Sequence, residues 1–111
     1  MFQVESQGAV DVIAPSVSLN TESIEQLADT IEQGLSEGQP MVVLDMSDVQ
    51  LIDSSGLETL LDAQQALRLK GGAIKLACLS QLCKDVLRVT GVSEQFDTFR
   101  DVKEAVRSYL R

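Results

Sequence analysis

The stretch Asp53-Ser54-Ser55-Gly56-Leu57 decides how the chain is organised, because an apolar pair precedes it and a helical pattern follows it. The pair Leu51-Ile52 is typical of a core segment, and the leucines at 57, 60 and 61 are spaced as on one helix face. The stretch is therefore predicted to be a sharp turn that opens a helix. A helix start has unpaired N–H groups and about half a unit of positive charge, so it tolerates a phosphate.

The two serines of this turn are predicted to have different roles. Ser55 and Glu58 fit the capping box, in which Ser55 accepts from the N–H of Glu58 and the Glu58 carboxylate accepts from the N–H of Ser55. Ser54 then lies one residue outside the helix with an uncommitted hydroxyl, and we expect it to be the modified serine. Gly56, at the first helical position, would let a partner approach the backbone. The alternative is that both serines only form a polar turn, because such caps are common.

The composition indicates an acidic globular chain that lacks the usual catalytic side chains. Its 111 residues suit one domain, and 44% hydrophobic with 23% charged content excludes a disordered chain. The net charge of −8 argues against binding to nucleic acid or to an anionic membrane surface. The chain has no histidine, which removes the commonest general base and the commonest zinc ligand. We therefore expect no enzyme activity, no metal site and no cofactor.

A cytosolic location is expected from the absence of export and membrane signals. Residues 1–5 have neither the basic region nor the apolar run of a signal peptide. No stretch approaches the roughly 20 apolar residues that span a bilayer. Cys78 and Cys83 have neither C-x-x-C nor zinc-site spacing, so they are predicted to be reduced core cysteines.

Strand-like and helix-like patterns alternate along the chain, which predicts an α/β fold. Alternating residues at 2–7 and 10–13 predict a hairpin, and apolar runs at 41–44 and 73–78 predict buried strands, with a short edge strand at 96–99. Helices are predicted from Asn20 to before Gly38, from Ser55 to Lys70, after Ser80 and after Asp101. The result is a mostly parallel sheet of about five strands with an N-terminal antiparallel hairpin and about four flanking helices. Ligands of such sheets bind beyond the carboxyl ends of the strands, and we place the turn after Ile52 there.

The segments 43–49 and 51–57 together resemble the signature of the STAS domain, and more closely that of the bacterial anti-sigma factor antagonists. The likeness continues through Gly71-Gly72, the strand Ile74 to Cys78 and the run from Leu87 to Val92, and it covers essentially the whole chain. It implies a single STAS domain over residues 1–111, with a sheet flanked by helices.

The resemblance implies a role in partner switching. The unphosphorylated domain would bind a serine kinase of the histidine-kinase-like ATPase type, which doubles as an anti-sigma factor, and so free a sigma factor. Phosphorylation of the first serine of Asp-Ser-Ser-Gly, here Ser54, would release the kinase until a PP2C-type phosphatase restores binding. The domain itself would catalyse nothing. The expected partner-binding residues are Asn20, Asp53, Ser54, Ser55, Gly56 and Leu57.

One position departs from the family pattern. Members usually have Gly-x-Leu-Asp before the first helix, whereas this chain has Pro15 to Asn20, and alignment on the helix face puts Asn20 at the Asp position. Asn keeps the cap and drops the charge. The alternative function is a constitutive subunit that is not phosphorylated, for example beside a membrane transporter. A monomer or a weak dimer is expected.

Overall fold

The computed structural model describes residues 2–7, 10–15, 26, 29 and 41–109. The predicted helix after Asn20 lies outside the described residues except for Gln26 and Asp29, which are both helical and exposed. The elements in chain order are β1 (Phe2–Gln7), β2 (Val10–Pro15), β3 (Met41–Asp45), α2 (Ser54–Leu69), β4 (Ala73–Ala77), α3 (Gln81–Val89), the 3-10 helix η1 (Val92–Gln95), β5 (Thr98–Phe99) and α4 (Val102–Tyr109).

The strands form one sheet whose spatial order, β1-β2-β3-β4-β5, is also their order in the chain. β1 is antiparallel to β2, and every other neighbouring pair is parallel. Val43 in the middle of β3 is aligned with Val12 and with Lys75. The predicted α/β class and the parallel sheet with an N-terminal hairpin are confirmed. About four helices were predicted, and the described residues form three α-helices.

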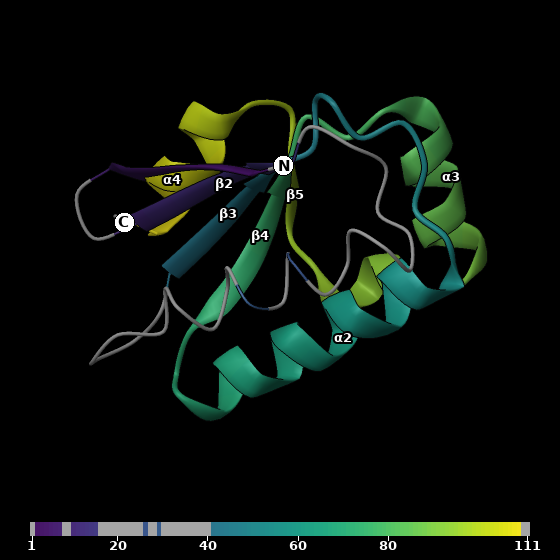
Figure 1. The fold of residues 1–111 in the computed structure, drawn as a ribbon, viewed down its shortest axis with the longest axis horizontal. Helices are drawn as coiled ribbons and strands as arrows, with labels where there is room; N and C mark the ends of the chain where they lie inside the picture. The colour runs from purple at the N-terminus through teal and green to yellow at the C-terminus, as the bar shows by residue number, and fades with distance from the viewer. Residues whose placement is uncertain (1, 8–9, 16–25, 27–28, 30–40, 110–111) are drawn as a thin grey trace.

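Helices cover both faces of the sheet, and the buried side chains of β2, β3 and β4 are divided between two cores. Figure 1 shows α4 on one face and α2 and α3 on the other. In β3, Val42 and Leu44 belong to the core with Leu60, Leu67 and the α3 residues, whereas Val43 between them packs with α4. Because β3 is buried on both faces, its sequence is an unbroken apolar run.

The β4 edge beside the short strand β5 is closed by a side chain of α2. β5 pairs only with Leu76 and Ala77, which leaves Ile74 without a strand neighbour on that side. Gln64, which is 3% exposed, takes the place of a strand: its Oε1 accepts from the N–H of Ile74 at 2.6 Å and its Nε2 donates to the Ile74 carbonyl at 3.3 Å. The same Nε2 donates to the carbonyl of Gln95 at 2.8 Å. One amide therefore joins α2, β4 and η1.

The last residue of α4 fastens that helix to the sheet. The Tyr109 hydroxyl donates to the carbonyl oxygens of Val42, at 2.9 Å, and of Ala73. The ammonium of Lys75 lies 4.1 Å from the centroid of the Tyr109 ring and donates to the Ser108 hydroxyl at 2.6 Å. Burial raises the pKa of Tyr109 far above its usual value, because the phenolate would lose its hydration.

Glycines end two helices as the sequence predicts. Gly71 after α2 and Gly91 after α3 have φ angles of 80° and 78°, a conformation that costs other residues energy. The N–H of Gly72 also donates to the carbonyl of Leu67 at 2.9 Å, which completes the hydrogen bonding at the end of α2. Ser80 and Asp101 cap α3 and α4 as predicted, with bonds from the N–H groups of Cys83 and Glu104.

Candidate functional site

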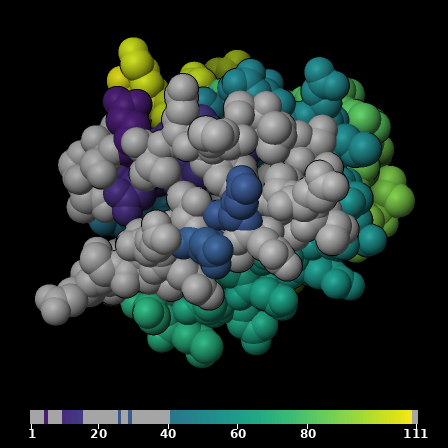
Figure 2. All heavy atoms as spheres, in the orientation of Figure 1, coloured from purple at the N-terminus to yellow at the C-terminus, as the bar shows by residue number. Residues whose placement is uncertain are grey.

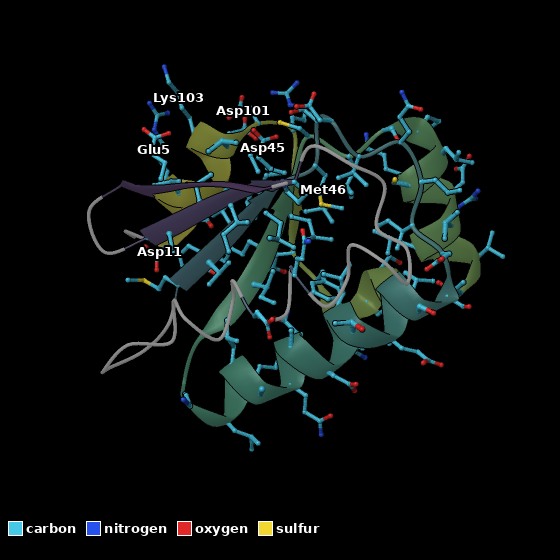
Figure 3. The ribbon with its side chains drawn as sticks, in the orientation of Figure 1. Glu5, Asp11, Asp45, Met46, Asp101 and Lys103 are labelled. Carbon is cyan, nitrogen blue, oxygen red and sulfur yellow. The ribbon has the colours of Figure 1, made fainter. Side chains whose placement is uncertain are left out.

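The turn that carries the two serines is held by the connection between β3 and α2, residues 46–53. Every third residue of this connection, Met46, Val49 and Ile52, is buried in the core shared with α2 and α3. Figure 3 labels Met46 at the point where the chain leaves β3. Leu51 was predicted to be in the core, but 48% of it is exposed, so that prediction is wrong. Three buried anchors fix the course of the chain up to Asp53.

Asp53, and not Ser55, caps the helix. Asp53 has an extended backbone (φ −91°, ψ −178°), and its Oδ1 accepts from the N–H of Gly56 at 2.9 Å. Its carbonyl accepts the first intrahelical bond, from Leu57 at 2.9 Å. The predicted capping box of Ser55 and Glu58 is therefore wrong. The helix begins two residues earlier than that box requires, so the third helical residue is Gly56 and not Glu58, and an aspartate caps as well as a serine.

The earlier helix start changes the position of every other residue in the turn. Ser54 is the first helical residue and does not lie outside the helix as predicted. Gly56 is the third residue and is buried, so its backbone is not open to a partner. Leu57 is 8% exposed and packs in the core. Gly56 and Leu57 therefore shape the turn from inside, and their contact with a partner stays a prediction.

Ser54 is the exposed hydroxyl of the turn. The residue is exposed, and within the described part of the chain its hydroxyl has no hydrogen bond, whereas Ser55 is half-buried. The first turn of α2 has no basic residue, and Glu58 is exposed one turn further along. Ser54 thus lies at the positive end of the helix, directly after Asp53 and about one helical turn before Glu58. Asn20, the other predicted partner contact, lies outside the described residues.

The two cysteines differ in environment. Cys83 is fully buried, as predicted, and its thiol donates to the Val49 carbonyl at 3.7 Å. Cys78, at the end of β4, is only half-buried and has a φ of 62°. Burial, together with the carboxylates of Asp45 and Asp101, raises the pKa of the Cys78 thiol. Figure 3 labels both aspartates, Asp45 at the end of β3 and Asp101 just before α4. A thiol with a raised pKa stays protonated, which is the opposite of an activated nucleophile.

Among the residues that the structure describes, no three histidine, cysteine, aspartate or glutamate side chains lie close enough together to hold a metal ion. None of the described helices combines the length and the apolar character needed to cross a bilayer.

Comparison with protein families and solved structures gives consistent results. The family model described as the STAS domain matches residues 1–105. An anti-sigma-factor antagonist (STAS) domain protein from Planctomyces limnophilus aligns with a TM-score of 0.86 at 23% identity, covering 99% of this chain and 98% of that one. The Bacillus cell fate determinant SpoIIAA in its phosphorylated form aligns with a TM-score of 0.71 at 22% identity, covering 100% of both chains.

The same fold occurs within a larger membrane protein. A murine anion transporter of Solute Carrier family 26 aligns with a TM-score of 0.79 at 20% identity, covering 92% of this chain and 18% of that one. No curated protein sequence matches the chain. At such identities the structural likenesses establish the fold alone. They do not assign the functions of those proteins to this chain.

Proposed function

The chain belongs to the STAS domain family, and we propose that it is a protein-binding switch controlled by phosphorylation of Ser54. In this proposal the unphosphorylated form binds a serine kinase of the histidine-kinase-like ATPase type and relieves the inhibition that this kinase exerts as an anti-sigma factor. Phosphorylation releases the kinase, and a PP2C-type phosphatase restores binding. SpoIIAA, which shares the fold, is an anti-sigma factor antagonist solved in unphosphorylated and phosphorylated forms.

The observation that carries the proposal is the exposed Ser54 hydroxyl at the first position of α2. A kinase can reach this hydroxyl without unfolding the turn, because the cap bond to Gly56 is made by Asp53. The positive end of the helix dipole accommodates the new phosphate, so the fold survives modification. Phosphorylation is therefore expected to alter the surface and to leave the structure beneath it unchanged.

The same phosphate would oppose binding. It adds about 1.5 to 2 negative charges beside the carboxylates of Asp53 and Glu58. A partner that docks closely on the unmodified turn must then desolvate that charge or leave it unpaired, and either is costly. A loss of about 2.7 kcal/mol in binding free energy lowers the affinity for the partner about 100-fold. That is enough to change the domain from mostly bound to mostly free.

Other residues of the turn take supporting roles in this proposal. Asp53 fixes the start of the helix, Gly56 and Leu57 hold it against the core, and the half-buried Ser55 follows Ser54 on the helix. Asn20 remains a proposed partner contact. The domain itself is proposed to be non-catalytic, in keeping with its lack of histidine, and to act in the cytosol as a monomer or weak dimer.

The proposal is tested with two baits, Ser54→Ala and Ser54→Asp, each incubated with lysate of the source organism and analysed by mass spectrometry. A histidine-kinase-like ATPase enriched on the alanine bait and absent from the aspartate bait is the expected result. Equal recovery of the same proteins on both baits would make Ser54 a structural residue and overturn the proposal.

A second candidate function is a constitutive accessory subunit, for example of a transporter. The specific observation behind it is the occurrence of this fold inside a murine anion transporter. This candidate predicts that both baits recover the same membrane protein and that the protein isolated from cells has no phosphate on Ser54.

A further inference from the structure

Exposed apolar side chains of the described residues gather near the Ser54 turn. Among all the residues that the structure describes, four large apolar ones are exposed: Leu51 (48%), Leu82 (53%), Val89 (79%) and Leu69 (85%). Three of the four lie on the connection 46–53 and on α3. Leu82 and Val89 are seven residues apart, which puts them on the same face of α3, and the half-buried Val86 lies between them on that face.

Contacts in the core join this apolar surface to the turn. The Cys83 thiol of α3 donates to the Val49 carbonyl of the connection at 3.7 Å. Both residues pack in one core with Leu57 of α2, and Val86 packs against that core. Figures 1 and 2 show the connection running beside α3 to the start of α2. Ser54 and the apolar face of α3 are therefore parts of one rigid unit.

We propose that Leu51, Leu82, Val86 and Val89 form a docking surface for the serine kinase, separate from the phosphorylated hydroxyl; this inference rests on the proposed function and specifies how the kinase recognises the domain. Protein interfaces combine an apolar centre with a polar rim. Here the apolar centre is the α3 face, and its continuity with the Ser54 turn lets one partner cover both.

Charge identifies the kind of rim that the kinase should present. The connection 46–53 contributes Asp48 and Asp53 and no basic residue. On α3, Arg88 is paired with Asp85 at 3.3 Å, and the exposed Lys84 lines a different hollow, with Cys78 and Thr98. The whole chain has a net charge of −8. The complementary surface is a shallow apolar patch bordered by lysine or arginine.

A second copy of the chain suits this surface less well than the kinase does. Stable interfaces bury about 1,600 Å² in total, far more than a few partly exposed side chains provide. A kinase that also covers the Ser54 turn adds the remaining area. Because the docking residues of α3 lie about 30 residues from Ser54 in the sequence, the kinase should act on the folded domain and poorly on a peptide that contains only the Ser54 turn.

The test uses the double variant Leu82→Gln/Val89→Gln, with Leu69→Gln as the matched control. Leu69 is also an exposed leucine, but it lies at the other end of α2, roughly 22 Å from Ser54 at 1.5 Å per residue. The ligand is the ATPase recovered on the Ser54→Ala bait, titrated calorimetrically, and its phosphorylation of Ser54 is followed at several domain concentrations. Circular dichroism and thermal melting check that each variant is folded.

The double variant should bind about tenfold more weakly, which corresponds to about 1.4 kcal/mol, and should raise KM with little change in kcat. The control should bind like the wild type. Equal affinity of double variant and wild type would overturn the docking surface, while continued loss of binding by Ser54→Asp would leave the proposed function standing. A wild-type dimer that the double variant breaks would show that a second copy occupies the surface, which also overturns the inference.

Discussion

Replacing Gln64 with glutamate tests whether one buried amide closes the edge of β4. Gln64→Glu preserves the shape of the side chain and keeps the acceptor for the N–H of Ile74, 2.6 Å away. It removes both N–H donors, so the Ile74 carbonyl loses its partner and faces a carboxylate, while the Gln95 carbonyl keeps only the bond from the Arg68 guanidinium at 2.8 Å. A buried carbonyl left without a donor costs about 1–3 kcal/mol, and we expect a loss of about 2 kcal/mol at neutral pH. The melting temperature should fall by roughly 8 °C for a domain of this size.

The loss should depend on pH in a defined direction. Burial and the two carbonyls raise the pKa of the introduced carboxyl above the value of about 4.3 that it has in the unfolded chain. The Arg68 guanidinium, which donates to the same Gln95 carbonyl, acts in the opposite direction, but it is exposed and offsets only part of this rise. The unfolded state therefore releases the proton first as pH rises, so the variant becomes less stable relative to the wild type with rising pH. Urea unfolding at about pH 7 and about pH 5 should show a smaller difference between variant and wild type at the lower pH.

Gln65→Glu is the matched control, because Gln65 is the next residue on α2 and is exposed. Its stability should stay within about 0.5 kcal/mol of the wild type. If Gln64→Glu and Gln65→Glu unfold at the same urea concentration, the amide does not close the strand edge and the reasoning is refuted.

Three further changes probe single features of the structure. Asp53→Ala should destabilise the domain by about 1 kcal/mol and Asp53→Asn by much less, because asparagine also caps; equal losses in urea unfolding would argue against the cap. Tyr109 is the only tyrosine, so phenolate absorbance reports its pKa directly. Since that pKa is raised, wild-type stability should fall as pH rises above about 10, and a Tyr109→Phe variant should lack this fall; parallel curves would contradict it. Gly91→Ala should cost about 1 kcal/mol through backbone strain alone, because φ is 78° and no atom lies within 4 Å of an added Cβ; a neutral result in thermal melting would contradict this.

The sheet could be predicted from the sequence because its signals are redundant. The run from Met41 to Leu44 is apolar throughout, and two covered faces require that. Pro15 ends β2, and glycines with positive φ end α2 and α3. Each signal comes from local chemistry that tertiary contacts do not override.

The start of α2 could not be predicted, because Asp53, Ser54 and Ser55 are all good capping residues and the S-x-x-E pattern favoured the wrong one. The buried anchors of the connection decide the outcome by delivering Asp53 in an extended conformation. Gln64 shows the same limit. Gln64 and Gln65 are adjacent and identical in type, yet Gln64 is buried and bonded to Ile74 of β4, while Gln65 is exposed. The difference comes from the position of β4, which begins only after α2 has ended.

The most direct test of the central proposal is the affinity of the recovered ATPase for two forms of the wild-type domain, unphosphorylated and fully phosphorylated on Ser54. Both forms should have the same far-ultraviolet circular dichroism, because the phosphate lies at a helix start that tolerates it. The account predicts that phosphorylation weakens binding at least about 100-fold, or about 2.7 kcal/mol. Affinities within about twofold of each other would contradict it and show that Ser54 does not control the partner.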